Sequence, residues 1–332
     1  TIPTDALIIG DYAFYGVSGL TSVTLPSTLT TIGIYGFAGT GISTVTIPAN
    51  VATINSYAFY NCKNLSSFTY NTTKITEISV YCFRGCTKLT GITLPSTITR
   101  IRESAFNQSG LTSISIPDNV TTIDNWAFSY CENLTTISFG TSTLIQDVSY
   151  EAFSGSNKLT YYTTSNAKYL GYPSSSSYYY LVMLFMSSQT ISSFSINSYC
   201  RCIGHNATES YRYLENGNWY SSWVEWTITS CSVPSRVRVL GRYFMYNKST
   251  LTSVSIGSGV VYIHEYVFGY CYYVSSYTFS ATNCTYIGGS CFVGFGAQVD
   301  SGVYVTISSG VTRLYTGVVG SSCYVRVLYF NG

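Results

Sequence analysis

The chain has 332 residues and a net charge of +2, and charged side chains make up 9% of it, against roughly 25% in an average soluble domain. We therefore expect no nucleic-acid partner and no anionic membrane surface, because both are held by clustered Lys and Arg. No stretch approaches the ~20 consecutive apolar residues of a transmembrane helix, so we expect no membrane insertion in this segment.

The first part of the chain, residues 1–164, repeats one pattern every 22 to 25 residues. It starts inside a repeat and shows no signal-peptide pattern, which predicts a mature or trimmed chain. The unit is clearest over 111–134, LTSISIPDNVTTIDNWAFSYCENL, where alternating aliphatic residues predict a short strand that Pro117 ends. We expect one Phe per unit to fill the interior of a coil: Phe14, Phe37, Phe59, Phe83, Phe106, Phe128 and Phe153.

Such a period is typical of leucine-rich solenoids, in which one unit buries its apolar face only by stacking on its neighbours. The repeats are interrupted over 165–226 by two insertions. In the first, 165–188, a Pro-Ser turn between two apolar runs predicts a hairpin. The chain then returns to register, with Ile203 in the position of Ile123, but the Phe expected five residues later is missing.

The second insertion, 205–226, contains Asn216-Gly217, a strong signal for a two-residue hairpin turn. Aromatic residues surround this turn, and they form the candidate ligand-binding site: Tyr211, Tyr213, Trp219, Tyr220, Trp223 and Trp226. One interpretation is a platform that stacks on sugar rings or anchors a protein partner. The other is a flap that covers the core where the repeat Phe is missing, and we favour this second interpretation while keeping the region as the candidate site.

The repeats resume over 227–332, with Phe244, Phe268 and Phe292 in the Phe position and Val319 replacing the next one. Pro234 precedes Phe244 by 10 residues. The other prolines in register precede their Phe by 11, and these are Pro3, Pro26, Pro48, Pro95 and Pro117. We expect the three segments 1–164, 165–226 and 227–332 to form one continuous solenoid domain.

The repeats resemble a known family, the BspA-like leucine-rich repeats of bacterial and protozoan surface proteins. The segments LTSVTLPSTLTTIGIYGF (20–37) and VATINSYAFYNCKNL (51–65) carry the resemblance, which covers nearly the whole chain, including an insertion-like stretch at 166–185. The resemblance implies surface display, adhesion or ligand binding.

Most of the 11 cysteines fall on repeat positions that other units fill with small or aliphatic residues. We expect buried free thiols there, because free Cys behaves as a small hydrophobe. An odd count without a C-x-x-C pair argues against zinc, and we expect no metal and no cofactor. A strained bridge between Cys200 and Cys202 stays open as a weaker alternative.

Few residues point to catalysis. Glu209, Glu215 and Glu225 lie near the aromatic residues of the second insertion, but nothing in the sequence sets the separation that a pair of glycosidase carboxylates needs. His264-Glu265 resembles the start of a zinc-protease motif but lacks the second His. We therefore expect no enzyme.

Together these patterns predict a mainly β, right-handed leucine-rich-repeat solenoid of about thirteen coils of 22–25 residues with two hairpin-like insertions. The expected function is a cell-surface or secreted binding and adhesion module for a protein or carbohydrate ligand. The alternative is a structural subunit that self-associates end to end into an extracellular filament or surface layer. Both place the protein outside the cell.

Overall fold

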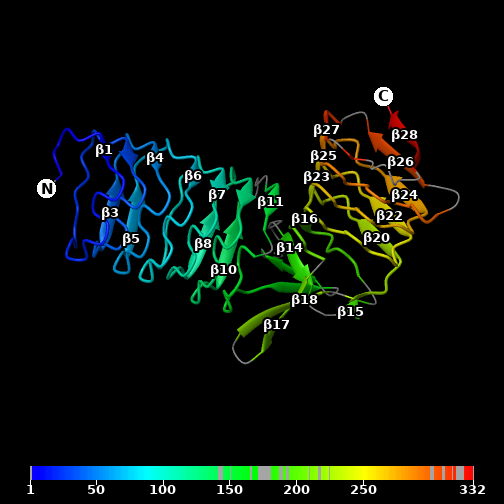
Figure 1. Ribbon diagram of the computed structural model, residues 1–332, viewed down its shortest axis with the longest axis horizontal. Coiled ribbons are helices and arrows are strands. Elements are labelled where there is room, and N and C mark those ends of the chain that lie inside the picture. The colour runs from blue at the N-terminus through cyan, green and yellow to red at the C-terminus, as the bar shows by residue number, and fades with distance from the viewer. Residues whose placement is uncertain are drawn as a thin grey trace. The chain divides into compact units, whose positions relative to one another are not determined.

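The structure is a computed structural model that describes residues 2–140, 145–149, 151–164, 167–170, 181–186, 190–191, 194–208, 210–215, 218–223, 225–299, 303–308, 311–315, 317–318 and 325–331. Every regular element within these ranges is a β-strand (Figure 1). The chain forms two compact units, the first Thr1–Ile145 with Glu151–Thr160, the second Gln146–Tyr150 with Tyr161–Gly332. The expectation of one continuous domain stays a prediction.

Strands of two lengths in the first unit pair in parallel from coil to coil, in several short ladders. The two-residue strands are β1 (Ile8–Ile9), β2 (Thr31–Ile32), β4 (Thr53–Ile54), β6 (Glu77–Ile78), β7 (Arg100–Ile101) and β9 (Thr122–Ile123), paired β1–β2–β4 and β6–β7–β9. The four-residue strands are β3 (Thr44–Ile47), β5 (Ser67–Tyr70), β8 (Ser113–Ile116) and β10 (Thr136–Phe139), paired β3–β5 and β8–β10. Burial alternates along these strands, which follows from the two-residue period of side chains.

The predicted Phe positions of the first unit form a continuous stack inside the coils, which we call the phenylalanine row: Phe14, Phe37, Phe59, Phe83, Phe106, Phe128 and Phe153. Neighbouring ring centroids lie 5.1 to 5.8 Å apart, with ring planes within 9° of parallel. Phe37 and Phe128 are completely buried. The spacing of the phenylalanines in the sequence therefore predicted the core correctly.

After β11 (Asp147–Val148), the second unit has an antiparallel group of three strands. These are β12 (Tyr162–Thr164), β13 (Ala167–Leu170) and β14 (Leu181–Met186), and β13 pairs antiparallel with both β12 and β14. The antiparallel β13–β14 pair confirms a hairpin in the first insertion, while its Pro-Ser turn lies outside the described residues.

Parallel coils follow in the second unit. One ladder joins β14 to β16 (Cys200–Ile203), β21 (Val239–Leu240), β23 (Tyr262–Ile263), β25 (Tyr286–Ile287) and β27 (Arg313–Leu314). Others join β20 (Ser230–Val233), β22 (Ser253–Ile256) and β24 (Ser276–Phe279), then β26 (Val303–Ser308) and β28 (Val325–Asn331), and β15 (Thr190–Ile191) and β19 (Glu225–Trp226). The solenoid prediction is confirmed, with about 10 turns rather than thirteen. The prediction counted the residues of the interrupted segment as coils, but part of that segment forms antiparallel strands instead.

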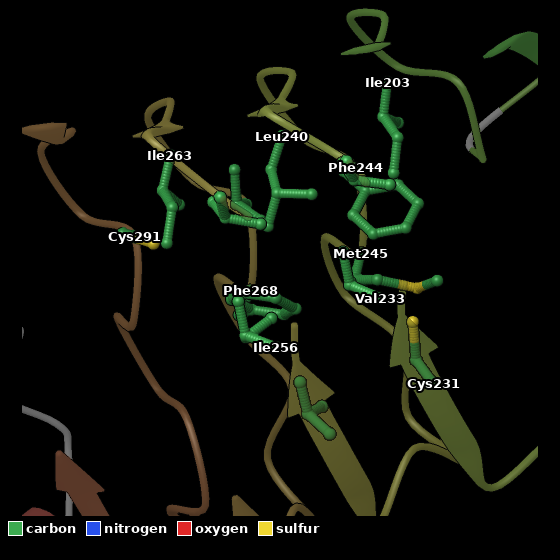
Figure 2. Packing of buried hydrophobic residues seen from close by; sticks show 14 of the residues in the cluster. Ile203, Cys231, Val233, Leu240, Phe244, Met245, Ile256, Ile263, Phe268 and Cys291 are labelled. Atoms are coloured by element: carbon green, nitrogen blue, oxygen red, sulfur yellow. The ribbon is translucent and has the colours of Figure 1, made fainter. Parts of the chain in front are cut away.

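The assignment of Phe244 to the Phe position is wrong, because Met245 occupies it. The backbone N–H of a Phe-position residue donates to the residue before the Phe of the next coil, as Phe106 does to Ala127. In the second unit Met245 donates to Val267 in this way, at 2.7 Å, directly before Phe268. Figure 2 shows the Met245 side chain pointing toward Cys231 while Phe244 lies nearer the layer of Leu240.

The buried-thiol prediction is confirmed for the ten cysteines that the structure describes, all of them free and buried. Four thiols three residues after the Phe position donate to the carbonyl of the preceding coil's Phe-position residue: Cys62 to Phe37, Cys86 to Phe59, Cys131 to Phe106 and Cys271 to Met245, at 2.8 to 3.2 Å. The alternative bridge is not formed, since Cys200 and Cys202 are free thiols and Cys200 Sγ donates to the carbonyl of Cys202.

Candidate functional site

The second insertion folds as an antiparallel hairpin of β17 (Ser210–Glu215) and β18 (Asn218–Trp223), which we call the aromatic hairpin. Its register runs from Glu215 opposite Asn218 to Ser210 opposite Trp223, which confirms the two-residue connection predicted from Asn-Gly. The connecting residues themselves lie outside the described part of the chain. In Figure 1 the hairpin extends away from the coils of the second unit.

The register of the hairpin sorts its aromatic positions onto two faces. Residues directly opposite each other in an antiparallel pair share a face, and faces alternate along each strand. Tyr213 is opposite Tyr220, and Tyr211 shares their face. Trp219 and Trp223 occupy the alternate positions and therefore the other face. The sequence alone left this assignment open.

Among the described strands, β17 is the one that pairs the hairpin with the rest of the second unit. Met186 of β14 pairs with Tyr211 of β17, and among the described strands β18 pairs only with β17. One long side of β18 therefore carries backbone N–H and C=O groups without a strand neighbour in the described part of the chain.

Trp226 closes the insertion and lies against the core rather than in the hairpin. Its ring is half-buried and meets Phe194 edge to face at 5.4 Å. Its Nε1 donates to the carbonyl of Thr208 at 3.0 Å. Thr208 is the fully buried residue five after Ile203, so it fills the position of the missing Phe. Trp226 thus covers the core beside the substituted position.

A polar cluster lies next to this part of the core. His205 Nε2 lies 2.7 Å from Asp147 Oδ1, and His264 Nε2 lies 2.8 Å from the carbonyl oxygen of Gln146. Burial raises the pKa of Asp147, but the hydrogen bond and charge of His205 outweigh it and lower the pKa overall. Burial lowers the pKa of His264, with partial compensation from Asp147.

The burial and the existing contacts of these groups leave little opportunity for them to bind a ligand or take part in a reaction. Both histidine rings are largely buried, and the atoms named above already have protein partners. No three His, Cys, Asp or Glu side chains in the described ranges are arranged to hold a metal ion. Glu209 lies outside the described residues, and for Glu215 and Glu225 the structure describes only the backbone. We assign the cluster a structural role.

Sequence reasoning missed a second row of rings in the first unit, the tyrosine row of Tyr12, Tyr35, Tyr57 and Tyr81, of which Tyr12 is exposed and the other three are half-buried. Neighbouring rings are stacked 4.4 to 5.0 Å apart and within 15° of parallel. Each tyrosine has φ between 54° and 61°, a left-handed conformation that costs a non-glycine residue about 1–3 kcal/mol. Tyr recurring two residues before Phe was the available signal. Because ring faces cover one another, the row is better suited to holding its own turns than to stacking on a ligand.

Comparison with known proteins identifies the repeats. A family model described as a BspA type leucine rich repeat region (6 copies) matches residues 1–109, 67–179, 105–223 and 183–319. No curated protein matches the chain. Among the described residues, nothing helical has the length and hydropathy to cross a membrane.

Three solved structures are similar at low identity. A leucine-rich repeat protein from Bacteroides ovatus ATCC 8483 is 18% identical over 100% of this chain and 77% of its own, with a TM-score of 0.41. A leucine rich cell surface protein from Faecalibacterium prausnitzii A2-165 is 20% identical over 98% and 83%, with a TM-score of 0.35. A leucine-rich repeat protein from Eubacterium ventriosum ATCC 27560 is 18% identical over 81% of each chain, with a TM-score of 0.35.

Proposed function

The chain belongs to the BspA-type leucine-rich repeat family, and from that premise we propose that it is a non-enzymatic binding and adhesion module displayed on a cell surface or secreted. The observation that carries this proposal is the aromatic hairpin, which extends from the second unit although the stacking of coils does not require it (Figure 1). Its ligand is a protein or a glycan.

The composition of the hairpin supports a contact role. Tyr and Trp bring large contact areas at low conformational-entropy cost and carry a polar group that bonds a partner. The register gives the hairpin two different faces, one with Tyr211, Tyr213 and Tyr220 and the other with Trp219 and Trp223. A ligand that rests on one face depends on one of these two sets alone.

Trp226 has a separate role in this proposal. Its contacts with Phe194 and Thr208 support the covering function that we favoured for the insertion as a whole. We therefore restrict the proposed contact surface to Tyr211, Tyr213, Trp219, Tyr220 and Trp223, and treat Trp226 as part of the core.

The test replaces each face separately, with Tyr213→Ala/Tyr220→Ala in one variant and Trp219→Ala/Trp223→Ala in the other. Retention of each variant on immobilised glycans and extracellular matrix proteins is measured beside its melting temperature. We expect one variant to lose binding by at least about tenfold while its melting temperature stays within about 2 °C of wild type. Binding that survives in both variants, or a loss of stability that accompanies every loss of binding, would contradict the assignment.

The alternative, a self-associating structural subunit, has one observation in its favour. Leu7 and Ile8 are 58% and 62% exposed in the first coil. Ile8 pairs in register with Thr31, so the first coil has an apolar side chain at a position where the next coil has a polar one. Adjacent exposed apolar residues favour contact with another chain. Sedimentation velocity at increasing concentration tests this, and Ile8→Thr should abolish any association that depends on the patch.

A further inference from the structure

The turns that follow the phenylalanine row differ in length, and two short turns each lie between two longer ones, one before Ile42 and one before Leu111. Four residues separate Phe106 from the next core residue, Leu111, whereas five separate Phe83 from Leu89 and Phe128 from Leu134. The shorter turn is also drawn in closely, because a Cβ at Gly110 would lie 2.1 Å from the carbonyl oxygen of Thr87. A receding turn between two longer ones leaves a hollow on the surface of the first unit.

A cavity of about 470 Å³ occupies this place, and we call it the polar groove. Its volume falls within the range of about 300–1,000 Å³ that is usual for small-molecule sites. The groove crosses four coils, so three strand spacings make it about 14 Å long. It is lined by Asn61, Lys63, Gly85, Thr87, Gln108, Ser109, Gly110, Tyr130, Glu132 and Asn133.

The lining limits the chemistry of a ligand. It contains no aliphatic side chain, so an apolar ligand would gain little by entering. Its charged groups are one Lys63 and one Glu132, which together give no net field for an anion or a cation. What it offers is amide, hydroxyl and backbone groups around one aromatic ring, which suits a neutral molecule with many hydroxyls and one apolar face.

Tyr130 is the ring in question, and Tyr is an unusual residue type at its position in the first unit. It lies two residues after Phe128 with φ of 55°, where four other coils of the first unit have Gly in the same left-handed region. The ring is 55% exposed and passes over Gly155, where a Cβ would lie 2.5 Å from Tyr130 Cδ1. A strained aromatic residue that stays exposed where Gly is usual points to a contact role.

One amide of the groove has a hydrogen-bond partner in the protein, and a second lies close against a glycine. Lys158 Nζ donates to Asn133 Oδ1 at 3.1 Å, so the amide nitrogen of Asn133 is the part that can donate to a ligand. Asn61 reaches across Gly85, where a Cβ would lie 2.1 Å from Asn61 Oδ1. Preorganised polar groups of this kind lower the cost of ordering side chains on binding.

We propose that the polar groove binds a short neutral oligosaccharide, with one sugar ring packed on Tyr130 and its neighbours hydrogen-bonded by Asn61, Gln108 and Asn133. This goes beyond the function proposed above, because the groove lies on the first unit and its binding does not depend on the aromatic hairpin. Its length favours two to three sugar units over a single one.

The test is isothermal titration calorimetry of the whole chain with tetramers of β-1,4-linked glucose, α-1,4-linked glucose and N-acetylglucosamine. We expect at least one tetramer to bind, and Tyr130→Gly to weaken it by at least about tenfold. Glycine suits the left-handed backbone at this position, so the variant removes the ring without adding strain. Thr87→Trp, at an exposed position in the middle of the groove, should block binding by filling it.

The matched control is Tyr273→Ala, which removes a 48%-exposed tyrosine of the second unit and should leave the affinity unchanged. Circular dichroism melts confirm that each variant is folded. Absence of binding for every tetramer, or equal binding by wild type and Tyr130→Gly, would overturn the proposal. So would binding of an extended unstructured peptide that competes with the tetramers at higher affinity. Trp219→Ala/Trp223→Ala should not change tetramer binding, which separates this proposal from that for the hairpin.

Discussion

The two units differ in the residues that fill the Phe position at the centre of their coils. In the first, seven phenylalanines stack without a break. In the second, the Phe position passes from Thr208 to Met245 before Phe268 restores the pattern. The hydroxyl of Thr208 donates a hydrogen bond to the carbonyl of Phe244 in the next coil. Trp226, from the insertion, covers the core beside Thr208.

This difference shows that the backbone, and not the phenyl ring, defines the repeat. The N–H of Phe128 and the N–H of Met245 both donate to the next coil, at 2.7 Å, although one side chain is Phe and the other Met. Where the ring is absent, apolar area must come from elsewhere in the chain, since each coil is buried only by its neighbours. The second unit therefore depends on its insertion in a way that the first unit does not.

The largest effect is expected in the first unit. Phe128→Ala should lower the free energy of unfolding by about 3–5 kcal/mol, because the rings on either side, at 5.3 and 5.5 Å, are fixed by their own coils and cannot fill the cavity. Urea unfolding followed by circular dichroism measures this. Met245→Leu, a change of similar volume at the same repeat position, should cost less than about 1.5 kcal/mol. Equal losses in both variants would contradict the assignment of Phe128 and Met245 to one repeat position.

The next effect concerns the cover of the second unit. Trp226→Ala should lower the free energy of unfolding by about 2–3 kcal/mol, less than for a fully buried ring, because Trp226 is half-buried. Trp226→Phe retains a ring against Phe194 and loses only the hydrogen bond to Thr208, so we expect a loss of about 1 kcal/mol. Guanidinium unfolding curves of both variants provide the comparison. A Trp226→Ala variant as stable as wild type would mean that the insertion does not cover the core.

A pH dependence should distinguish the units. The pKa of His264 is lowered in the fold, so the unfolded chain binds that proton more readily and stability falls as the pH drops below about 6.5. The pKa values of Asp147 and Glu265 are also lowered in the fold. Protonation of these carboxylates removes their charge and weakens their interactions with neighbouring groups, so we expect a second loss of stability below about pH 4. Hydrogen exchange followed by mass spectrometry at pH 7 and pH 5 should show increased exchange in the second unit first. His264→Gln should remove the part of this loss between pH 6.5 and pH 5.

The smallest effect concerns the thiols. Burial raises the pKa of Cys131 to about 11, so a thiol reagent should label it only after denaturation. Cys131→Ser should change the free energy of unfolding by less than about 1 kcal/mol, because Ser156 already fills the equivalent position and donates to the carbonyl of Phe128 at 2.6 Å. Cys131→Val removes the donor to Phe106 and should cost about 1–3 kcal/mol. Labelling of the native protein at the rate of a free thiol would contradict the buried position.

The sequence predicted what is periodic and missed what depends on local geometry. The phenylalanine row followed from spacing alone. Met245 was missed because the residue before it, Phe244, is a phenylalanine like those of the other repeats. The 11-residue spacing from Pro234 pointed to Met245. The coil number was too high because antiparallel strands cannot be told from coil strands by composition.

Sites were less predictable than the core. The two faces of the aromatic hairpin follow only from its register, which composition does not determine. The tyrosine row requires a left-handed backbone at aromatic residues, which no propensity favours. The polar groove was only partly predictable. Counting residues between each Phe and the next core residue gives two short turns, one before Ile42 and one before Leu111, and does not show which of them borders a cavity.

The in-register pairing of equivalent residues has a consequence for how such a chain can change over generations. Ile32 faces Ile54 across one interface and Ile101 faces Ile123 across another, so the interfaces between coils are nearly interchangeable. A gene that loses or duplicates one whole repeat therefore encodes a protein whose remaining coils still fit. What such an event does change is the order of long and short turns. Loss of the repeat that carries Gln108 would leave the phenylalanine row unbroken and erase the polar groove, so surface features can be gained or lost faster than the scaffold.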